Sequence, residues 1–207
     1  MKIIIFGATG SIGCNVVEQA LEKGHQVTAF ARNPSALEIN HSNLSLVKGD
    51  VLNKVDVTNA LADQDAVIIT LGAGSKGDIR APGTSNIIEG MKQSSIKRLV
   101  CLSTIGAGNS YHLLNSFWKY IMFGLLLRKA LADHEAQEGV VRNSGLDWIV
   151  VRPGAFTDGP LTGGYKHGSI DSKEKIELKV SRSDIANFII SSLNDGTYLH
   201  KMPCLSY

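Results

Sequence analysis

The chain has 207 residues, of which 43% are hydrophobic and 19% are charged, and its mean hydropathy is +0.04. This composition excludes a disordered chain and a collagen-like chain, and it supplies enough apolar side chains for one folded domain. The formal net charge of +2, from 21 basic and 19 acidic residues, gives no indication of nucleic acid or an anionic membrane as a partner.

The three cysteines, Cys14, Cys101 and Cys204, lie far apart in the sequence. An odd number of cysteines without a CxxC pair predicts reduced thiols and no metal site. The start of the chain lacks the long apolar run of a signal peptide, and the apolar cluster at residues 120–127 is too short to span a bilayer, which needs about 20 residues. We therefore expect a soluble, cytoplasmic protein without a membrane partner.

Short apolar runs alternate with amphipathic stretches along most of the chain. Continuous aliphatic runs predict strands covered on both faces, at residues 2–6, 26–31, 44–48, 66–71, 98–102 and 148–152. Helical patterns lie at 11–23, about 55–62, 84–93, within 115–143 as one long helix, and around 182–193. Gly24 is a typical helix stop after the first of these. The alternation predicts a single α/β domain over residues 1–207, with a doubly wound parallel sheet, helices on both faces and an irregular substrate-side segment near 156–177.

A glycine-rich loop follows the first predicted strand and opens the first predicted helix; its sequence is Gly7-Ala8-Thr9-Gly10-Ser11-Ile12-Gly13. In this context the motif indicates a Rossmann-type dinucleotide site. Gly7 permits the turn, Gly10 lets backbone N–H groups approach a pyrophosphate, and Gly13 lets the helix pack closely on the strand. We expect Thr9, Ser11 and Ile12 to take part in the same cradle. A glycine-rich turn without a ligand is the alternative.

The end of the second predicted strand distinguishes between the two nicotinamide cofactors. An NAD site places Asp or Glu there to hold the ribose 2′-hydroxyl, and residues 27–33 contain no acid. Arg32 stands there instead, and a guanidinium can bind a 2′-phosphate bidentately. We therefore expect NADPH as the cofactor. A solvated surface charge is the alternative interpretation of Arg32.

Two further loops follow predicted strands at the edge where such sheets bind ligands. Asp50 and Val51 follow the third strand, and Asp50 is expected either to accept a hydrogen bond from the adenine amino group or to cap the next helix. Leu71 and Gly72 begin a loop over residues 71–74 whose glycines would let the backbone run under the nicotinamide ribose. An ordinary flexible loop is the alternative for that stretch.

The chain lacks the Tyr-x-x-x-Lys pair that would bring a phenol close to neutral titration, which argues against simple alcohol dehydrogenases and sugar epimerases. Ser103 and Thr104 follow the fifth predicted strand. We expect Ser103, the candidate catalytic residue, to hydrogen-bond the nicotinamide carboxamide, a substrate or a water molecule; a turn cap is the alternative. Farther on, Lys129, Asp133, His134 and Glu135 are interpreted as a solvated helix face, with catalysis by Lys129 or His134 as the second interpretation.

Several short motifs extend over nearly the whole chain. They are Gly49-Asp50-Val51-Leu52, Gln64-Asp65-Ala66-Val67-Ile68, Asn143-Ser144-Gly145-Leu146, Arg152-Pro153, Asp158-Gly159-Pro160-Leu161-Thr162-Gly163-Gly164-Tyr165 and Ser181-Arg182-Ser183-Asp184-Ile185-Ala186. Together with the glycine loop they resemble the biliverdin-IXβ reductase/flavin reductase family, an atypical branch of the short-chain dehydrogenases/reductases. The similarity is greatest to bacterial members associated with haem uptake, which act as anaerobilin or biliverdin reductases.

This resemblance implies NADPH bound across the sheet edge and hydride delivery to a linear tetrapyrrole or a flavin, in haem breakdown. It implies that Thr9 and Ser103 lie beside the nicotinamide, and we count Thr104 and Pro153 with the cofactor-binding residues. Ala155 stands where vertebrate members carry a histidine. We take Ala155 and the next residue, Phe156, as candidate substrate contacts.

The segment after Ser103 is longer than in that family and includes Tyr111, His112, Phe117, Trp118, Tyr120, Met122 and Phe123, most of them aromatic. It is expected either to form a lid or wall over the acceptor, with Tyr111 and Trp118 as substrate contacts, or to be buried between two subunits. Both a monomer and a homodimer remain open. Two rival functions also remain: an NADP(H)-binding regulator of the NmrA type without turnover, and an NADPH-dependent quinone reductase.

Overall fold

The computed structural model describes residues 1–72, 77–169 and 176–207. Its main sheet has the strand order β3-β2-β1-β4-β5-β6-β10-β8. These strands are β1 (Lys2–Phe6), β2 (Gln26–Ala31), β3 (Leu44–Lys48), β4 (Ala66–Ile69), β5 (Arg98–Leu102), β6 (Asp147–Pro153), β8 (Lys166–Gly168) and β10 (Cys204–Ser206). All neighbours are parallel except β8 and β10. The order reverses between β1 and β4, as in a doubly wound Rossmann sheet, so the predicted fold class is confirmed.

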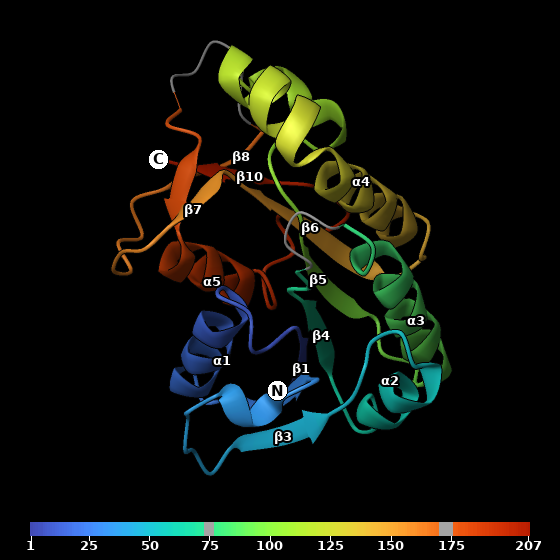
Figure 1. Cartoon of the computed structure of the whole chain (residues 1–207). Helices are drawn as coiled ribbons and strands as arrows, with labels where there is room; N and C mark the ends of the chain where they lie inside the picture. Colours follow the sequence, from blue (N-terminus) through green and yellow to red (C-terminus); the bar gives the residue numbers. More distant parts are fainter. Residues whose placement is uncertain (73–76, 170–175) are drawn as a thin grey trace.

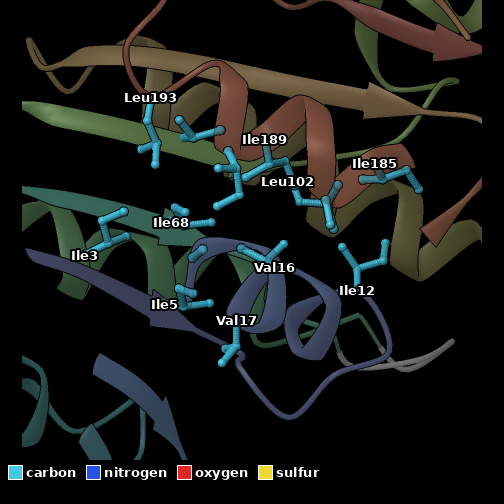
Figure 2. Close-up of a cluster of buried hydrophobic side chains, with 14 of the residues drawn as sticks. Ile3, Ile5, Ile12, Val16, Val17, Ile68, Leu102, Ile185, Ile189 and Leu193 are labelled. Atoms are coloured by element: carbon cyan, nitrogen blue, oxygen red, sulfur yellow. The ribbon is translucent and has the colours of Figure 1, made fainter. Parts of the chain in front are cut away.

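Helices cover both faces of the sheet (Figure 1). On one face lie α1 (Gly13–Glu22) and α5 (Arg182–Ser191), and on the other α2 (Lys54–Ala60), α3 (Arg80–Gln93) and α4 (Arg128–Arg142). Successive side chains of β1 alternate between the faces: Ile3 and Ile5 join the cluster under α1 and α5 (Figure 2), and Ile4 and Phe6 join the opposite cluster. Burial on both faces explains why the central strands β1, β4 and β5 are almost entirely apolar.

The predicted strand positions are confirmed, with small shifts at the ends. The strand predicted at 66–71 ends at Ile69, and the helix predicted at 84–93 begins four residues earlier, at Arg80. The helix stop at Gly24 is also confirmed: its φ is +76°, and its N–H donates to the carbonyl of Leu21 at 2.9 Å. A left-handed residue of this kind is what favours glycine at a helix end.

The long helix predicted within 115–143 is confirmed, but it occupies only the second half of that range. A 3₁₀ helix, η2 (Gly108–Leu113), precedes a π-helix, η3 (Phe117–Leu126), and α4 starts after a break at Leu127. The Leu127 N–H donates to the carbonyl of Met122 at 2.6 Å, which closes the wide π turn. Residues 120–127 are apolar on every side, so the sequence shows no polar face from which the helical period could be read. Within the described residues, no helix is long and apolar enough to cross a membrane.

Four short strands near the end of the chain were not predicted. In addition to β8 and β10, β7 (Ala155–Thr157) pairs with β9 (Lys179–Ser181) in a separate two-stranded sheet. The segment near 156–177, expected to be irregular, therefore contains β8 and most of β7, while residues 170–175 lie outside the described part. Strands of three residues are too short to show an alternating pattern, and β10 forms because it pairs with β6.

The loop at residues 158–165 is tied to the start of α5 by one buried carboxylate. Asp184 accepts hydrogen bonds from the N–H groups of Thr162 and Gly163, both at 2.9 Å, and from the Tyr207 hydroxyl at 2.6 Å. Ser181 caps the helix by accepting from the Asp184 N–H at 3.0 Å. The motif at 158–165 that contributes to the family resemblance is therefore a structural anchor, and none of its described residues lines the cavities considered below.

Candidate active site

A cavity of about 320 Å³ lies at the carboxyl ends of β1 to β5, where sheets of this type bind their ligands. It collects most of the predicted site residues: Gly7, Thr9, Gly10, Ser11, Ile12, Arg32, Asp50, Val51, Leu71, Gly72, Ser103 and Phe156. It does not include Gly13, Thr104, Pro153, Ala155, Tyr111 or Trp118. Ala73 and Gly74, expected in the same loop as Gly72, lie outside the described residues. We call this space the cofactor cavity.

The glycine loop has no room for side chains at two of its glycines. A Cβ at Gly7, whose φ is +85°, would lie 2.7 Å from the Thr70 carbonyl oxygen, and a Cβ at Gly13 would lie 2.2 Å from the carbonyl oxygen of Gly7. Gly13 thus serves the close packing of α1 on the loop and does not line the cavity. Bare backbone at the N-terminus of α1 fits a pyrophosphate, which accepts hydrogen bonds and carries negative charge.

Thr70 fixes the loop from the neighbouring strand. Its hydroxyl lies 3.1 Å from the carbonyl oxygen of Phe6 and 3.2 Å from that of Gly7, within hydrogen-bonding distance of both. Thr70 was not among the predicted site residues, since its position directly after an apolar run was the only available signal. Thr70 also lines the cofactor cavity.

The residue predicted to bind the 2′-phosphate is Arg32. It directly follows β2, is exposed, borders the cofactor cavity and forms no ion pair within the described part of the chain. Asp50 is the acidic residue of the lining, and its carboxylate accepts from the Leu52 N–H at 2.9 Å. The alternative in which Asp50 caps the next helix is wrong, because Asn53 caps α2 by accepting from the Val55 N–H at 3.0 Å.

Ser103 is the outer end of a buried hydrogen-bond network. The residue is 1% exposed, and its hydroxyl donates to Oε1 of Glu138 at 2.7 Å. Arg152 holds the same carboxylate with two bonds, Nε to Oε1 at 2.8 Å and Nη2 to Oε2 at 2.6 Å, and it donates to Asn109 Oδ1 at 2.5 Å. Because the Ser103 proton points to Glu138, the lone pairs of the hydroxyl are what Ser103 offers the cavity.

Glu138 was not among the predicted site residues. Its position on a helix gave no sign that α4 would bring it beneath the end of β5. Arg152 was noted only as part of a motif, and the structure gives it a buried carboxylate partner. A buried ion pair of this kind fixes geometry more surely than it adds stability.

A second cavity of about 350 Å³ adjoins the first and is lined mainly by apolar side chains; we call it the acceptor cavity. It contains three predicted substrate residues, Trp118, Ala155 and Phe156, together with Thr104. Its other apolar walls are Ile105, Leu114, Phe123, Leu127, Ala130 and Leu178. Such walls suit a flat, apolar ligand.

Besides Gly13, two predicted site residues, Tyr111 and Pro153, line neither cavity. Tyr111 is exposed, and its hydroxyl donates to the Lys119 carbonyl oxygen at 3.3 Å. Pro153 is buried within β6, and its carbonyl oxygen accepts from the Ile105 N–H at 2.9 Å. Pro153 therefore holds the loop that lines the acceptor cavity from behind.

The aromatic segment has two different sides. Trp118 and Phe123, whose ring centroids lie 5.7 Å apart, turn inward to the acceptor cavity. Phe117, Tyr120 and Leu125 are 53%, 74% and 75% exposed. One side of η3 therefore forms a wall of the cavity, and the other side is an apolar surface.

The two cavities share Arg80, His134 and Phe156. The predicted solvated face is wrong for Asp133, which is buried and accepts from the N–H groups of Arg80 and Ala81, both at 3.0 Å, and from Nη1 of Arg80 at 3.3 Å. Burial, with Arg80 adding to it, lowers the pKa of His134 to about 3 against the weaker influence of Asp133. His134 is therefore neutral at pH 7.

Comparison with known proteins supports a nicotinamide cofactor in this site. A model of the NAD(P)H-binding family matches residues 7–196. The UPF0659 protein YMR090W of Saccharomyces cerevisiae is 27% identical over 208 residues, covering 93% of this chain and 87% of the yeast protein.

Solved structures share the fold. A short-chain dehydrogenase/reductase from Veillonella parvula in complex with NADP has a TM-score of 0.83 at 16% identity, with 100% of this chain and 94% of that chain covered. ChuY, an anaerobilin reductase from Escherichia coli O157:H7, has a TM-score of 0.79 at 22% identity, with 99% and 96% covered. The family model confirms the predicted nicotinamide cofactor as NAD(P)H. Since the family model covers most of its length, the chain belongs to the NAD(P)H-binding family of oxidoreductases.

Proposed function

We propose that the protein is an NADPH-dependent reductase of a flat, conjugated acceptor, with a linear tetrapyrrole (anaerobilin or biliverdin) as the first candidate and a flavin as the next. The observation that carries this proposal is the continuity of the cofactor cavity with an apolar, aromatic cavity through three shared residues. The motifs that resemble biliverdin-IXβ reductases and the fold shared with ChuY support the tetrapyrrole. When bound, NADPH supplies a hydride and leaves as NADP⁺, and the acceptor takes its proton from water.

Backbone groups, a cation and one hydroxyl of the cofactor cavity would each contact a different part of NADPH. The glycine loop would hold the pyrophosphate, and Arg32 the 2′-phosphate. Asp50 and Val51 would border the adenine, as Leu71 and Gly72 would border the nicotinamide ribose. Ser103, whose proton is directed to Glu138, would accept a hydrogen bond from the carboxamide N–H₂ group, which fixes the cofactor's orientation.

The acceptor cavity orients the second reactant by shape. Trp118 and Phe156 present aromatic faces and Ala155 leaves room beside them, so a planar conjugated molecule would stack there. Hydride transfer between two aligned π systems depends mainly on their placement. This explains how a chain without a Tyr-x-x-x-Lys pair can still act as a reductase.

The proposal is tested by a spectrophotometric assay with NADPH and biliverdin, in which nicotinamide absorbance and the visible tetrapyrrole band are followed together. Parallel reactions contain FMN as acceptor and NADH as donor. Loss of both bands, much faster with NADPH than with NADH, is the expected result. If NADPH binds but biliverdin, FMN and the quinone described below all fail to consume it, the reductase proposal fails and the NmrA-type regulator becomes the better interpretation.

A quinone is the third candidate acceptor. The acceptor cavity, at about 350 Å³, is a size that suits a molecule of two or three fused rings without further opening. The same assay with menadione distinguishes the two classes. Turnover with menadione but not with biliverdin assigns the protein to the quinone reductases.

A further inference from the structure

The outer side of η3 is an apolar surface at one end of the molecule (Figure 1). Five large apolar side chains within these ten residues are at least 48% exposed, namely Phe117, Tyr120, Ile121, Leu125 and Leu126. Single apolar side chains are normal on a protein surface, whereas a contiguous group of them marks a place of contact. We call these five residues the η3 surface.

The two sides of η3 differ in what they contact. Trp118 and Phe123 line the acceptor cavity, and they pack with Ile105 and Leu114 in one hydrophobic cluster. None of the residues of the η3 surface belongs to the hydrophobic clusters found in the described residues. Their apolar character therefore does not serve the packing of that part of the chain, and it favours contact with a partner outside it.

Basic residues accompany the η3 surface, and acidic residues are missing from this part of the sequence. Lys119 lies within η3, and Arg128 and Lys129 follow it at the start of α4. Residues 104–132 contain no Asp or Glu. Arg128 and Lys129 are exposed, and neither forms an ion pair within residues 1–72, 77–169 and 176–207. The small net charge of the whole chain, +2, conceals this local excess of positive charge.

The charges distinguish between the partners that this apolar surface could contact. In a twofold contact between two copies, the η3 surface of one chain would face that of the other. Such a contact would bring the cations of both copies together, and the segment offers no carboxylate to neutralise them. An anionic lipid bilayer complements both properties, because its headgroups attract Lys and Arg and its acyl boundary takes up aliphatic and aromatic side chains.

We propose that the η3 surface binds the protein to an anionic lipid bilayer as a peripheral contact. Leu125 and Leu126 would enter the boundary of the acyl chains, while Tyr120 would keep its hydroxyl among the headgroups. Arg128 and Lys129 would contact the lipid phosphates. The expectation of no membrane partner rested on the net charge and on the length of a spanning segment, and neither of these tests a surface contact.

Cosedimentation with lipid vesicles tests this contact. The protein is mixed with vesicles of phosphatidylcholine alone, or of phosphatidylcholine with about 30 mol% phosphatidylglycerol, which gives the bilayer a negative surface. Binding to the anionic vesicles is expected to be at least about tenfold tighter than to the neutral ones at low salt, because each basic residue adds attraction. This preference should weaken at high salt, which screens exposed charges. Equal binding to both kinds of vesicle, or binding to neither, overturns the proposal.

The double variant Arg128→Gln/Lys129→Gln tests the electrostatic part of the binding. Removal of two cations beside the lipid should lower the affinity for the anionic vesicles about ten- to thirtyfold. Lys92→Gln/Lys97→Gln is the matched control, since both lysines are exposed and lie outside residues 104–132. If the control pair lowers the affinity as much as the first pair, the attraction is not centred on the η3 surface and the proposal fails.

Leu125→Ser tests the apolar part of the binding. Because Leu125 is 75% exposed, the variant should keep its fold, as verified by circular dichroism, while its affinity for the anionic vesicles falls about five- to tenfold. Val55→Ser is the matched control, because Val55 is 65% exposed and lies on α2. Unchanged vesicle binding by a folded Leu125→Ser variant overturns the proposal.

Sedimentation velocity without lipid tests the other occupant, a second copy of the chain. The original protein and Leu125→Ser are expected to sediment alike. A dimer that Leu125→Ser dissociates, in a protein that binds neither kind of vesicle, assigns the η3 surface to a subunit contact and overturns the proposal. The vesicle experiments contain neither NADPH nor an acceptor, so their outcome does not depend on the reductase function.

Discussion

The cofactor cavity and the acceptor cavity are neighbours built on different principles. The first is made mostly from loops that directly follow β1 to β5, and backbone and short side chains form much of its lining. The second is made from side chains of segments far apart in the chain, including η3, α4 and the residues around β7 and β9. A cofactor that many proteins use can therefore be bound by a local sequence motif. The fit of a particular acceptor depends instead on how distant segments of the chain pack together. Variants of the two regions should therefore affect different constants.

The largest effect is expected from Gly10→Val. The added Cβ would lie 3.2 Å from the Gly7 carbonyl oxygen, and the rest of the valine would occupy the space for the pyrophosphate. NADPH affinity should fall by more than about a hundredfold, the loss of several charge-assisted hydrogen bonds, as measured by calorimetric titration. Gly139→Ala on α4 is the control, because a Cβ there meets nothing within 4 Å. Tight NADPH binding by Gly10→Val would remove the glycine loop from the site.

Arg32→Ala should have the next largest effect, and it should act on one cofactor only. Loss of the guanidinium is expected to raise the Kd of NADPH by about ten- to a hundredfold, the worth of a charge-assisted pair, and to leave the Kd of NADH within about twofold. Fluorescence titration with each cofactor measures both values. Lys54→Ala, an exposed cation outside the cofactor cavity, is the control. Equal weakening of NADPH and NADH would mean that Arg32 does not bind the 2′-phosphate.

Trp118→Ala tests whether the acceptor cavity acts independently of the cofactor cavity. Removal of the indole should raise the KM of the acceptor about three- to tenfold, from lost stacking, without changing the Kd of NADPH. Tyr111→Ala is the matched control on the same segment, because Tyr111 is exposed and lines neither cavity. Steady-state kinetics with the acceptor that the spectrophotometric assay identifies measure the change in KM, and a titration measures the Kd of NADPH. A KM effect of Tyr111→Ala as large as that of Trp118→Ala would instead favour a lid that closes over the acceptor.

The last effect concerns stability in acid. The pKa of His134 is about 3 in the folded protein, where burial and Arg80 disfavour the charged ring, against an ordinary value of 6.5. Between these values the unfolded state binds more protons, so the stabilising contribution of the neutral ring is complete above pH 6.5 and is lost as the pH falls to 3. His134→Gln should reduce the slope of the unfolding free energy against pH by up to about one proton in this window. Urea unfolding at several pH values measures it, with His112→Gln as control; an unchanged slope would contradict the shifted pKa.

Much of the cofactor half could be predicted because its signals are local. The apolar run of β1, the glycine loop and Arg32 at the end of β2 each have a meaning that depends only on their neighbours in the chain. Thr70 and Glu138 could not be found in this way. The role of Thr70 depends on which strand lies beside the glycine loop, and the role of Glu138 depends on which turn of α4 lies beneath β5. The neighbouring residues in the sequence do not indicate either arrangement.

Errors in the acceptor half have related physical causes. The apolar stretch at 120–127 gave no helical period, so the break at Leu127 was missed, and the strands β7 to β10 were too short to show a pattern. Asp133 looked like part of a charged surface because a sequence does not show that the N-terminus of α3 lies against it. The prediction that Tyr111 contacts substrate stays without support from the geometry.

The sequence by itself determined the alternation of strands and helices, the parallel sheet and the nicotinamide site, because β-strand burial and phosphate binding by a glycine loop follow from short contiguous segments. The tertiary structure decided which side chains line the acceptor cavity. It placed Arg80 and His134 together from two helices, directed the Ser103 proton to Glu138 and turned Trp118 inward from a π-helix. These features require long-range packing, in which each side chain takes its partner from a distant part of the chain.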